Sequence, residues 1–209
     1  MVEFALVLPL LLILLLGIAD FGRVFSAGIT IEAAARNAAE IGAVERLRNK
    51  PPDPVAAPAA FARYYSDLHQ LIARVACSEA RLLPNNTFLS DRTCPDTSEG
   101  TGMPVIRVCL HDAVAITPGS GDPACGAAIA GFGPSIPPEC SHMAQGWNNT
   151  SGGAAASHSV EVRVCYHFTT LFNLRIALPF ESGLNLGDVW LQRERVFVVD
   201  CPPGDVSTC

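Results

Sequence analysis

The sequence has few charged residues and lacks the short motifs that mark common catalytic sites. Charged residues make up 16% of the 209 residues and hydrophobic residues 49%, which excludes a disordered polyelectrolyte. No G-x-S-x-G, H-E-x-x-H or P-loop pattern occurs. We therefore expect a non-enzymatic protein with no cofactor and no metal site, in which His111, Asp112 and His158 are polar surface residues.

Basic residues are also scarce. The chain has 14 Lys and Arg against 20 Asp and Glu, which gives a net charge of -6 at pH 7. A protein that follows the nucleic-acid backbone needs an excess of cationic side chains to contact the phosphates. Nucleic acid is therefore not an expected partner.

The N-terminal region contains a long run without any charge, from Phe4 to Ala19. As a helix this run would measure about 24 Å, compared with about 30 Å for the hydrocarbon core of a bilayer. Apolar residues resume at Phe21, and Asp20 and Arg23 are spaced so that they can pair on one helix face. Because the apolar span can reach roughly 20 to 25 residues in this way, we expect a membrane helix in contact with lipid.

A cleaved secretory signal and a buried core helix are the two alternatives for this run. A secretory signal carries basic residues before its apolar core and small residues at a cleavage site, and neither flanks the run here. A helix that is apolar on all sides over such a length exceeds what one small domain normally buries. Both alternatives are less favoured than a single membrane-spanning helix.

The helical pattern continues as far as Pro51 and Pro52. Small apolar residues recur at three- and four-residue steps, and proline cannot continue a helix. The sequence predicts one long helix over residues 1–50, membrane-spanning at first and then extended, followed by a cysteine-rich domain over residues 51–209. The stripe of small residues permits close packing of a helix from the same domain or from another subunit.

Eight cysteines follow the apolar run, and no C-x-x-C pair occurs among them. An even number of cysteines favours disulfides formed in an oxidising compartment, whereas the usual ligand spacing of structural zinc is missing. The pairing is left open by the sequence. The disulfide candidates are Cys77, Cys94, Cys109, Cys125, Cys140, Cys165, Cys201 and Cys209.

The cysteines and the basic residues favour opposite orientations of the membrane helix. Disulfides require the domain to lie outside the cytoplasm. The positive-inside rule favours the reverse, because the basic residues follow the helix, beginning with Arg23. We give priority to the cysteines and expect a single-pass cell-membrane protein with a cytoplasmic N-terminus and an extracytoplasmic domain.

The remainder of the chain predicts an α+β domain in which an amphipathic helix lies on a small antiparallel sheet. Strands are expected at 104–111, 159–168 and 189–200, where residues alternate or are β-branched. Strands and helices do not alternate along the sequence as they do in βαβ units, which favours antiparallel pairing. The helix follows the proline-rich segment 51–58, and its expected apolar face consists of Phe61, Tyr65, Leu68, Leu71, Ile72 and Val75.

Two of the expected strands carry a local repeat, IRVCLH at 106–111 and VRVCYH at 162–167. On each strand Arg, Cys and His share one face. If the strands are neighbours, the two cysteines could bond to each other, or the cysteines and histidines of the repeat could ligate zinc. Separate disulfide partners are the favoured interpretation. The four side chains concerned are Cys109, His111, Cys165 and His167.

Several N-terminal motifs share their order and spacing with one known family. They are Val-Glu-Phe-Ala-Leu at 2–6, Leu-Pro-Leu at 8–10, Asp-Phe-Gly-Arg at 20–23 and an Ala-rich helix that contains Arg36. In these features the chain resembles the TadE/TadG-like pseudopilin family of the tight-adherence (Tad/Flp) pilus systems. The resemblance covers about the first 45 residues.

The resemblance implies a minor pseudopilin-like component of Tad/Flp pilus assembly, with a role related to adhesion or secretion. Its implied partners are other pilins or pseudopilins, the Tad assembly machinery and a prepilin peptidase. The implied assembly motif comprises Glu3, Phe4, Pro9, Asp20 and Arg23, and Glu3 matches the glutamate just inside the mature end of such proteins.

Family precursors carry a basic leader that ends in Gly shortly before that glutamate. We therefore expect either a longer, processed precursor or an unprocessed, membrane-anchored relative. A membrane-anchored extracytoplasmic binding module without a pilus role is the alternative function, and the Gly-rich segment between the first two strands would then be its contact surface.

Overall fold

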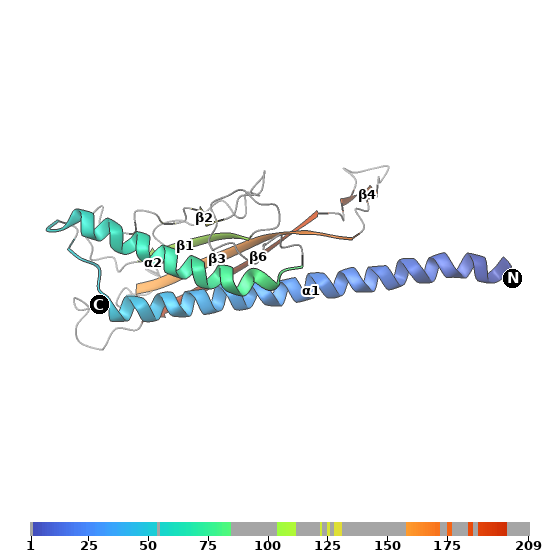
Figure 1. The fold of residues 1–209 in the computed structure, drawn as a ribbon, viewed down its shortest axis with the longest axis horizontal. Helices are drawn as coiled ribbons and strands as arrows, with labels where there is room; N and C mark the ends of the chain where they lie inside the picture. Colours follow the sequence, from blue (N-terminus) through green and yellow to red (C-terminus); the bar gives the residue numbers. More distant parts are fainter. Residues whose placement is uncertain are drawn as a thin grey trace, which may run out of the picture.

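The computed structural model describes a long helix, a second helix and two antiparallel sheets (Figure 1). The described residues are 2–53, 55–84, 104–111, 122, 125, 128–130, 158–171, 175–176, 184–185 and 188–199. The α+β class expected from the sequence is confirmed.

Helix α1 (Val2–Arg48) is a single continuous helix of 47 residues that includes Pro9. A backbone hydrogen bond from Asn49 N to Glu45 O closes its last turn, and Pro51 follows where no helix can continue. The sequence prediction of one long helix ending before this proline is confirmed. The predicted division at residue 50 falls just after the end of α1.

Helix α2 (Pro58–Glu79) begins with a proline, whose fixed φ angle suits the first turn of a helix. The turn before it is held by Asp53, whose carboxylate accepts a hydrogen bond from Val55 N at 2.8 Å. A short 3₁₀ turn, η1 (Ala80–Leu82), extends the C-terminal end of α2.

The buried face of α2 is centred differently from the apolar face expected from the sequence. Leu71 and Val75 are only partly buried, whereas the small residues Ala73 and Ala76 are fully buried. Large residues such as Tyr65 and Ile72 are buried on this face as expected, and the small residues beside them allow α2 to approach its neighbours closely, so that Leu71 and Val75 lie at its margin.

The main sheet has four antiparallel strands in the order β2-β1-β3-β6. The strands are β1 (Val105–His111), β2 (Ala128–Ala130), β3 (His158–Thr169) and β6 (Asp188–Val199). Three of them lie within one residue of the strands expected from the sequence, and β2 was not expected. A second, two-stranded sheet consists of β4 (Arg175–Ile176) and β5 (Leu184–Asn185).

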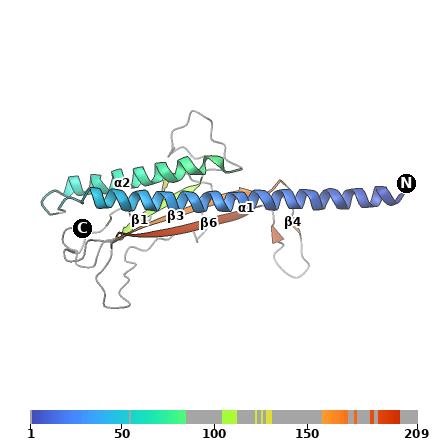
Figure 2. The same cartoon turned by 90° about the horizontal axis from the view of Figure 1, so that it is seen from below.

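Both helices pack on the same face of the main sheet, with α1 against β3 and β6 and α2 against β1 (Figure 2). The core between them contains alternate residues of the strands, such as Val108, Val162 and Val164, together with small residues of α1 from Ala27 to Ala43. The second half of α1 therefore belongs to the core of the folded domain, while the first half extends beyond it.

Glutamate and arginine side chains connect α1 to the edge strand β6. Glu32 Oε2 lies 3.4 Å from Arg193 Nε, and Glu32 Oε1 pairs with Arg195. Charged residues on an edge strand discourage pairing with a strand from another molecule. Arg193 and Arg195 therefore join β6 to the helix, and the charged residues at 193–195 also protect this edge.

Gly42 is the point of closest approach between α1 and the rest of the core. A Cβ atom at this position would lie 2.7 Å from Ile72 Cδ1 and 2.9 Å from Val160 Cγ1. The valine side chain is stiff about χ1, so it cannot easily yield. At Gly22, by contrast, a Cβ atom would meet nothing within 4 Å.

We expect Gly42→Ala to lower the free energy of unfolding by about 1–3 kcal/mol relative to Gly22→Ala, because only the first substitution overpacks the core. Both substitutions give the helix the same gain in propensity, so Gly22→Ala is a matched control. Denaturant unfolding of the full chain in detergent micelles measures the difference. Equal stability of the two variants would contradict the close packing described here.

Candidate anchoring and assembly site

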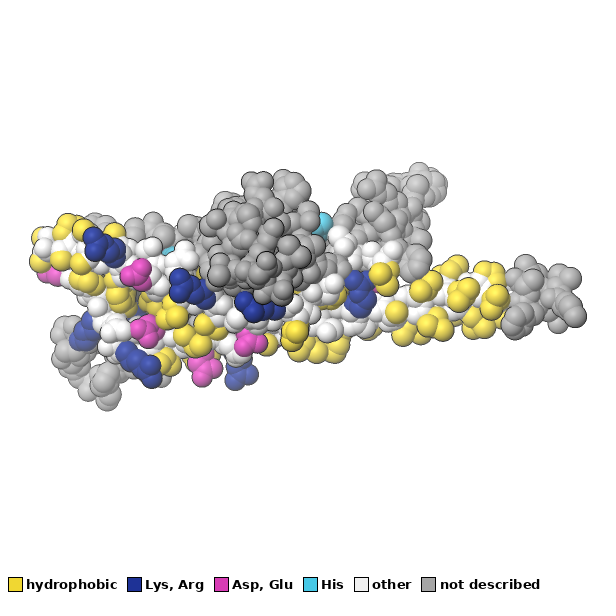
Figure 3. Space-filling view, in the orientation of Figure 1, with side chains coloured by type: hydrophobic (Ala, Val, Ile, Leu, Met, Phe, Trp, Pro, Cys, Tyr) yellow, Lys and Arg dark blue, Asp and Glu magenta, His cyan; other side chains and the backbone are white. Residues whose placement is uncertain are grey.

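The first half of α1 exposes a surface composed almost entirely of hydrophobic side chains (Figure 3). Its large residues include Leu10, Ile13, Leu15 and Ile18, each more than half exposed. Within the described residues, one helix is long and apolar enough to cross a membrane, and its most apolar segment makes no buried contact with the folded domain. This segment is not a core helix of its own domain, which removes one alternative interpretation of the sequence.

The exposed apolar half ends at a polar junction with the folded domain. Arg23 Nη1 donates to Asp20 Oδ1 at 3.0 Å, as the sequence spacing predicted. Leu171 N, just after β3, lies 3.1 Å from each carboxylate oxygen of Asp20. The Arg23 guanidinium lies over the ring of buried Phe168, 5.3 Å from the ring centroid. Asp20 and Arg23 thus connect the helix to the end of the sheet.

The other residues of the expected assembly motif lie nearer the N-terminus. Pro9 is exposed on α1, and α1 also includes Glu3 and Phe4, whose side chains lie outside the described part of the structure. The structure therefore brings Asp20 and Arg23 together and places the other three along the apolar half of the helix. The contact with Leu171 was not foreseen, because Leu171 is 151 residues from Asp20 in the chain.

The sheet face turned away from the helices carries a polar network centred on the buried residues His111 and Glu161. His111 Nε2 lies 2.6 Å from Glu161 Oε2, and Arg163 Nη2 lies 3.5 Å from Glu161 Oε1. Arg163 also pairs with Glu194 on β6. Arg107 lies directly opposite Arg163 in the strand register. Burial, and secondarily the positive charge of Arg163, lower the pKa of Arg107.

Two histidines expected on the surface are buried instead. His111 contacts Glu161, and His158 Nδ1 lies 3.5 Å from Nη2 of the buried Arg46 near the end of α1. The sequence prediction was wrong for both residues. Their partners come from other elements of the fold, so no local sequence pattern could indicate the burial.

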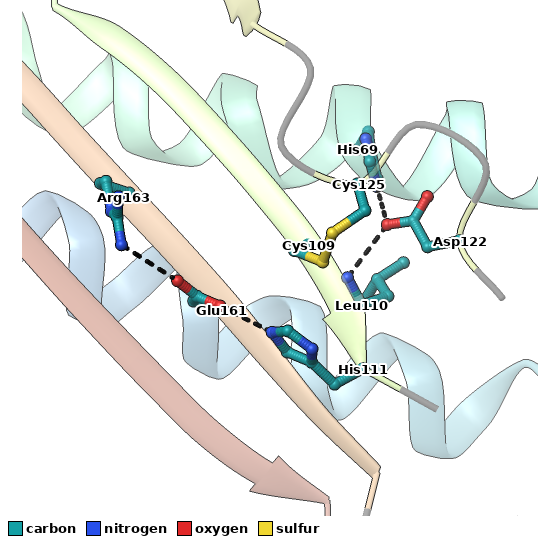
Figure 4. The surroundings of a disulfide bond; sticks show 8 residues. All are labelled: His69, Cys109, Leu110, His111, Asp122, Cys125, Glu161 and Arg163. Atoms are coloured by element: carbon teal, nitrogen blue, oxygen red, sulfur yellow. Dashed lines mark hydrogen bonds and ion pairs between the residues drawn. A yellow bond between two sulfur atoms is a disulfide. The ribbon is translucent and has the colours of Figure 1, made fainter. Parts of the chain in front are cut away.

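A disulfide joins Cys109 on β1 to Cys125 in the segment that follows β1 (Figure 4). The side chain of Asp122, in the same segment, is fully buried. Its Oδ2 atom lies 2.7 Å from His69 Nε2 on α2 and accepts a hydrogen bond from Leu110 N at 3.0 Å. The disulfide and Asp122 together attach this segment to both the sheet and α2.

The strand register explains why the repeated Cys and His residues do not form one site. The strands are antiparallel neighbours, so the two copies of the repeat run in opposite directions, with Cys165 opposite Val105 and Cys109 opposite Glu161. Because Cys109 is bonded to Cys125, it neither bonds to Cys165 nor serves as a zinc ligand. The favoured expectation of separate partners is confirmed.

The remaining cysteines divide into two groups. Cys77 and Cys165 are also disulfide-bonded. Cys94, Cys140, Cys201 and Cys209 lie outside the described residues. In the described part of the chain, no three His, Cys, Asp or Glu side chains gather in an arrangement that could hold a metal ion.

The geometry defines a protein with one helix that could span a membrane and a folded α+β domain built around the second half of that helix. Residues 1–40 match the family model described as TadE-like protein. The family resemblance expected from the sequence is thereby confirmed for this region. No curated protein and no solved structure matches the chain.

Proposed function

We propose that this chain is a non-enzymatic, minor pseudopilin-like component of a Tad/Flp pilus system, anchored in the cell membrane by α1. The observation that carries the proposal is the TadE-like match over residues 1–40, which covers the whole exposed apolar half of α1 and the Asp20–Arg23 junction. A TadE-like N-terminus indicates association with the Tad pilus machinery. The folded domain then lies outside the membrane, carried by the same helix.

The proposed orientation places the folded domain on the extracytoplasmic side. The disulfide between Cys109 and Cys125 supports this orientation, because stable disulfides form mainly in oxidising compartments. The partners of the exposed helix are membrane lipid and the helices of other pilins or pseudopilins. Small exposed residues such as Gly17 and Gly22, where a Cβ would meet nothing, permit another helix to approach closely.

We expect Glu3→Gln to reduce the amount of surface pili strongly while leaving the chain in the membrane fraction. A carboxylate at the edge of an apolar helix is costly to bury unless it is paired, and a neighbouring subunit's α-amino group can supply the opposite charge. Quantifying pili and membrane-bound chain in cells that carry each variant measures both effects.

Glu40→Gln is the matched control for this experiment, because Glu40 is exposed on the part of α1 beyond the membrane segment. It should leave pilus assembly unchanged. Cells without the chain that still assemble normal pili would contradict the pilus function. They would instead favour a membrane-anchored binding module with the same anchor.

A further inference from the structure

The charge-free part of α1 is shorter than the bilayer it is proposed to cross. Between Glu3 and Asp20 it contains 16 residues. At about 1.5 Å per residue these span about 24 Å, whereas the hydrocarbon core measures about 30 Å. If α1 is the membrane anchor of the proposed function, about four further residues must reach the hydrocarbon boundary, and these begin with the Asp20–Arg23 junction.

The junction has the contacts that such a position requires. A charged group in a medium of low dielectric constant is costly unless it is paired and hydrogen-bonded. The Asp20 side chain is only 13% exposed, pairs with Arg23 and lies within hydrogen-bond distance of Leu171 N. The Arg23 guanidinium lies over the aromatic ring of Phe168. The carboxylate therefore has its partners within the protein and does not depend on water.

Large apolar side chains are exposed on opposite sides of the helix at this level. Phe21 and Phe25 are 74% and 64% exposed on α1, and Phe25 lies about 140° around the helix from Asp20. Leu171 is 60% exposed on the side of the domain, next to Asp20. One protein partner would cover one side of the helix, whereas a bilayer surrounds it. The arrangement therefore fits lipid better than a second protein.

The end of the domain near Leu171 also faces the N-terminal half of α1. In both ribbon views β4 lies beyond the end of the main sheet, in the direction of the N-terminus (Figures 1 and 2). The described residues at this end of the domain are therefore Leu171 and the two residues of β4, Arg175 and Ile176.

From these observations we propose that the folded domain is seated directly on the bilayer, with Phe21, Phe25 and Leu171 in the boundary between acyl chains and headgroups. The membrane contact of this protein then includes the end of the domain as well as the helix. The Asp20–Arg23 pair, bound to Leu171, fixes the end of the domain against α1. The domain is thereby held at one distance from the membrane and in one orientation about the helix axis.

Photo-crosslinking of the full chain in vesicles of phosphatidylethanolamine and phosphatidylglycerol tests the proposal. The photoreactive p-benzoylphenylalanine replaces Phe25, Leu171, Leu12 or Leu47 in four separate variants. Leu12 lies within the apolar span, and Leu47 is an exposed apolar residue at the distant end of α1. Mass spectrometry then distinguishes an adduct with one phospholipid from an adduct with a second copy of the chain.

We expect the probes at Phe25 and Leu171 to give several-fold more lipid adduct than the probe at Leu47, and an amount comparable with the probe at Leu12. Lipid adducts at Leu12 without any at Phe25 and Leu171 would overturn the seating of the domain and leave the membrane anchor intact. Adducts between two copies at Phe25 would overturn it as well. Absence of lipid adducts at Leu12 would overturn both the seating and the proposed anchor.

Discussion

Asp122→Ala is expected to lower the free energy of unfolding of the domain by about 2–6 kcal/mol, because it leaves two buried groups without their acceptor, at about 1–3 kcal/mol each. One is His69 Nε2 on α2, and the other is the backbone N–H of Leu110 on β1. Neither group can reach water easily, since Asp122 and His69 are both buried. Denaturant unfolding of the full chain in detergent micelles measures the loss.

Two further substitutions make this prediction specific. Asp122→Asn keeps one acceptor oxygen and should lose less stability than Asp122→Ala. Asp67→Ala removes an exposed carboxylate from the same helix as His69 and should change the stability by no more than about 0.5 kcal/mol. If Asp122→Ala were as stable as Asp67→Ala, the bridge between α2 and β1 would contribute nothing.

Removing the disulfide by the double substitution Cys109→Ala and Cys125→Ala is expected to cost about 3 kcal/mol. The two cysteines are 16 residues apart, and the bond limits the freedom of this loop in the unfolded chain. Reduction of the wild-type protein would break every disulfide at once, so the double substitution is the more specific experiment. Its stability is measured in the same denaturant unfolding assay.

The loop contains both the disulfide and Asp122, so the two losses should not add. A chain that lacks the disulfide and also carries Asp122→Ala should lose less than the sum of the separate losses, because Asp122 is already less firmly held once the disulfide is absent. Strict additivity would show that the disulfide and the carboxylate stabilise the fold independently.

The regular elements of this fold could be predicted because their signals are local. Pro51 ends α1, and the alternation of residues along 159–168 identifies strand β3 with both of its faces. The antiparallel pairing also followed from the lack of a βαβ rhythm. In each case the spacing of apolar residues, or one residue type such as proline, determines the secondary structure of the surrounding residues.

The contacts that hold these elements together could not be predicted, because they join distant positions. His69 and Asp122 are 53 residues apart, and Arg46 and His158 are 112 apart. The face of α2 toward the core was also misjudged at Leu71 and Val75, because burial there depends on how closely the small residues allow the helices to approach. Only the assembled structure decides which polar residues become buried.

If the chain works in a pilus machine, as proposed above, the continuity of α1 has a mechanical consequence. The same helix supplies the exposed apolar segment and, from Ala27 to Ala43, part of the core beneath β3 and β6. A force on the N-terminal end of α1 runs parallel to these core contacts and loads them together in shear, instead of breaking them one after another. The domain should therefore resist extraction along the helix axis far better than a sideways pull on β6.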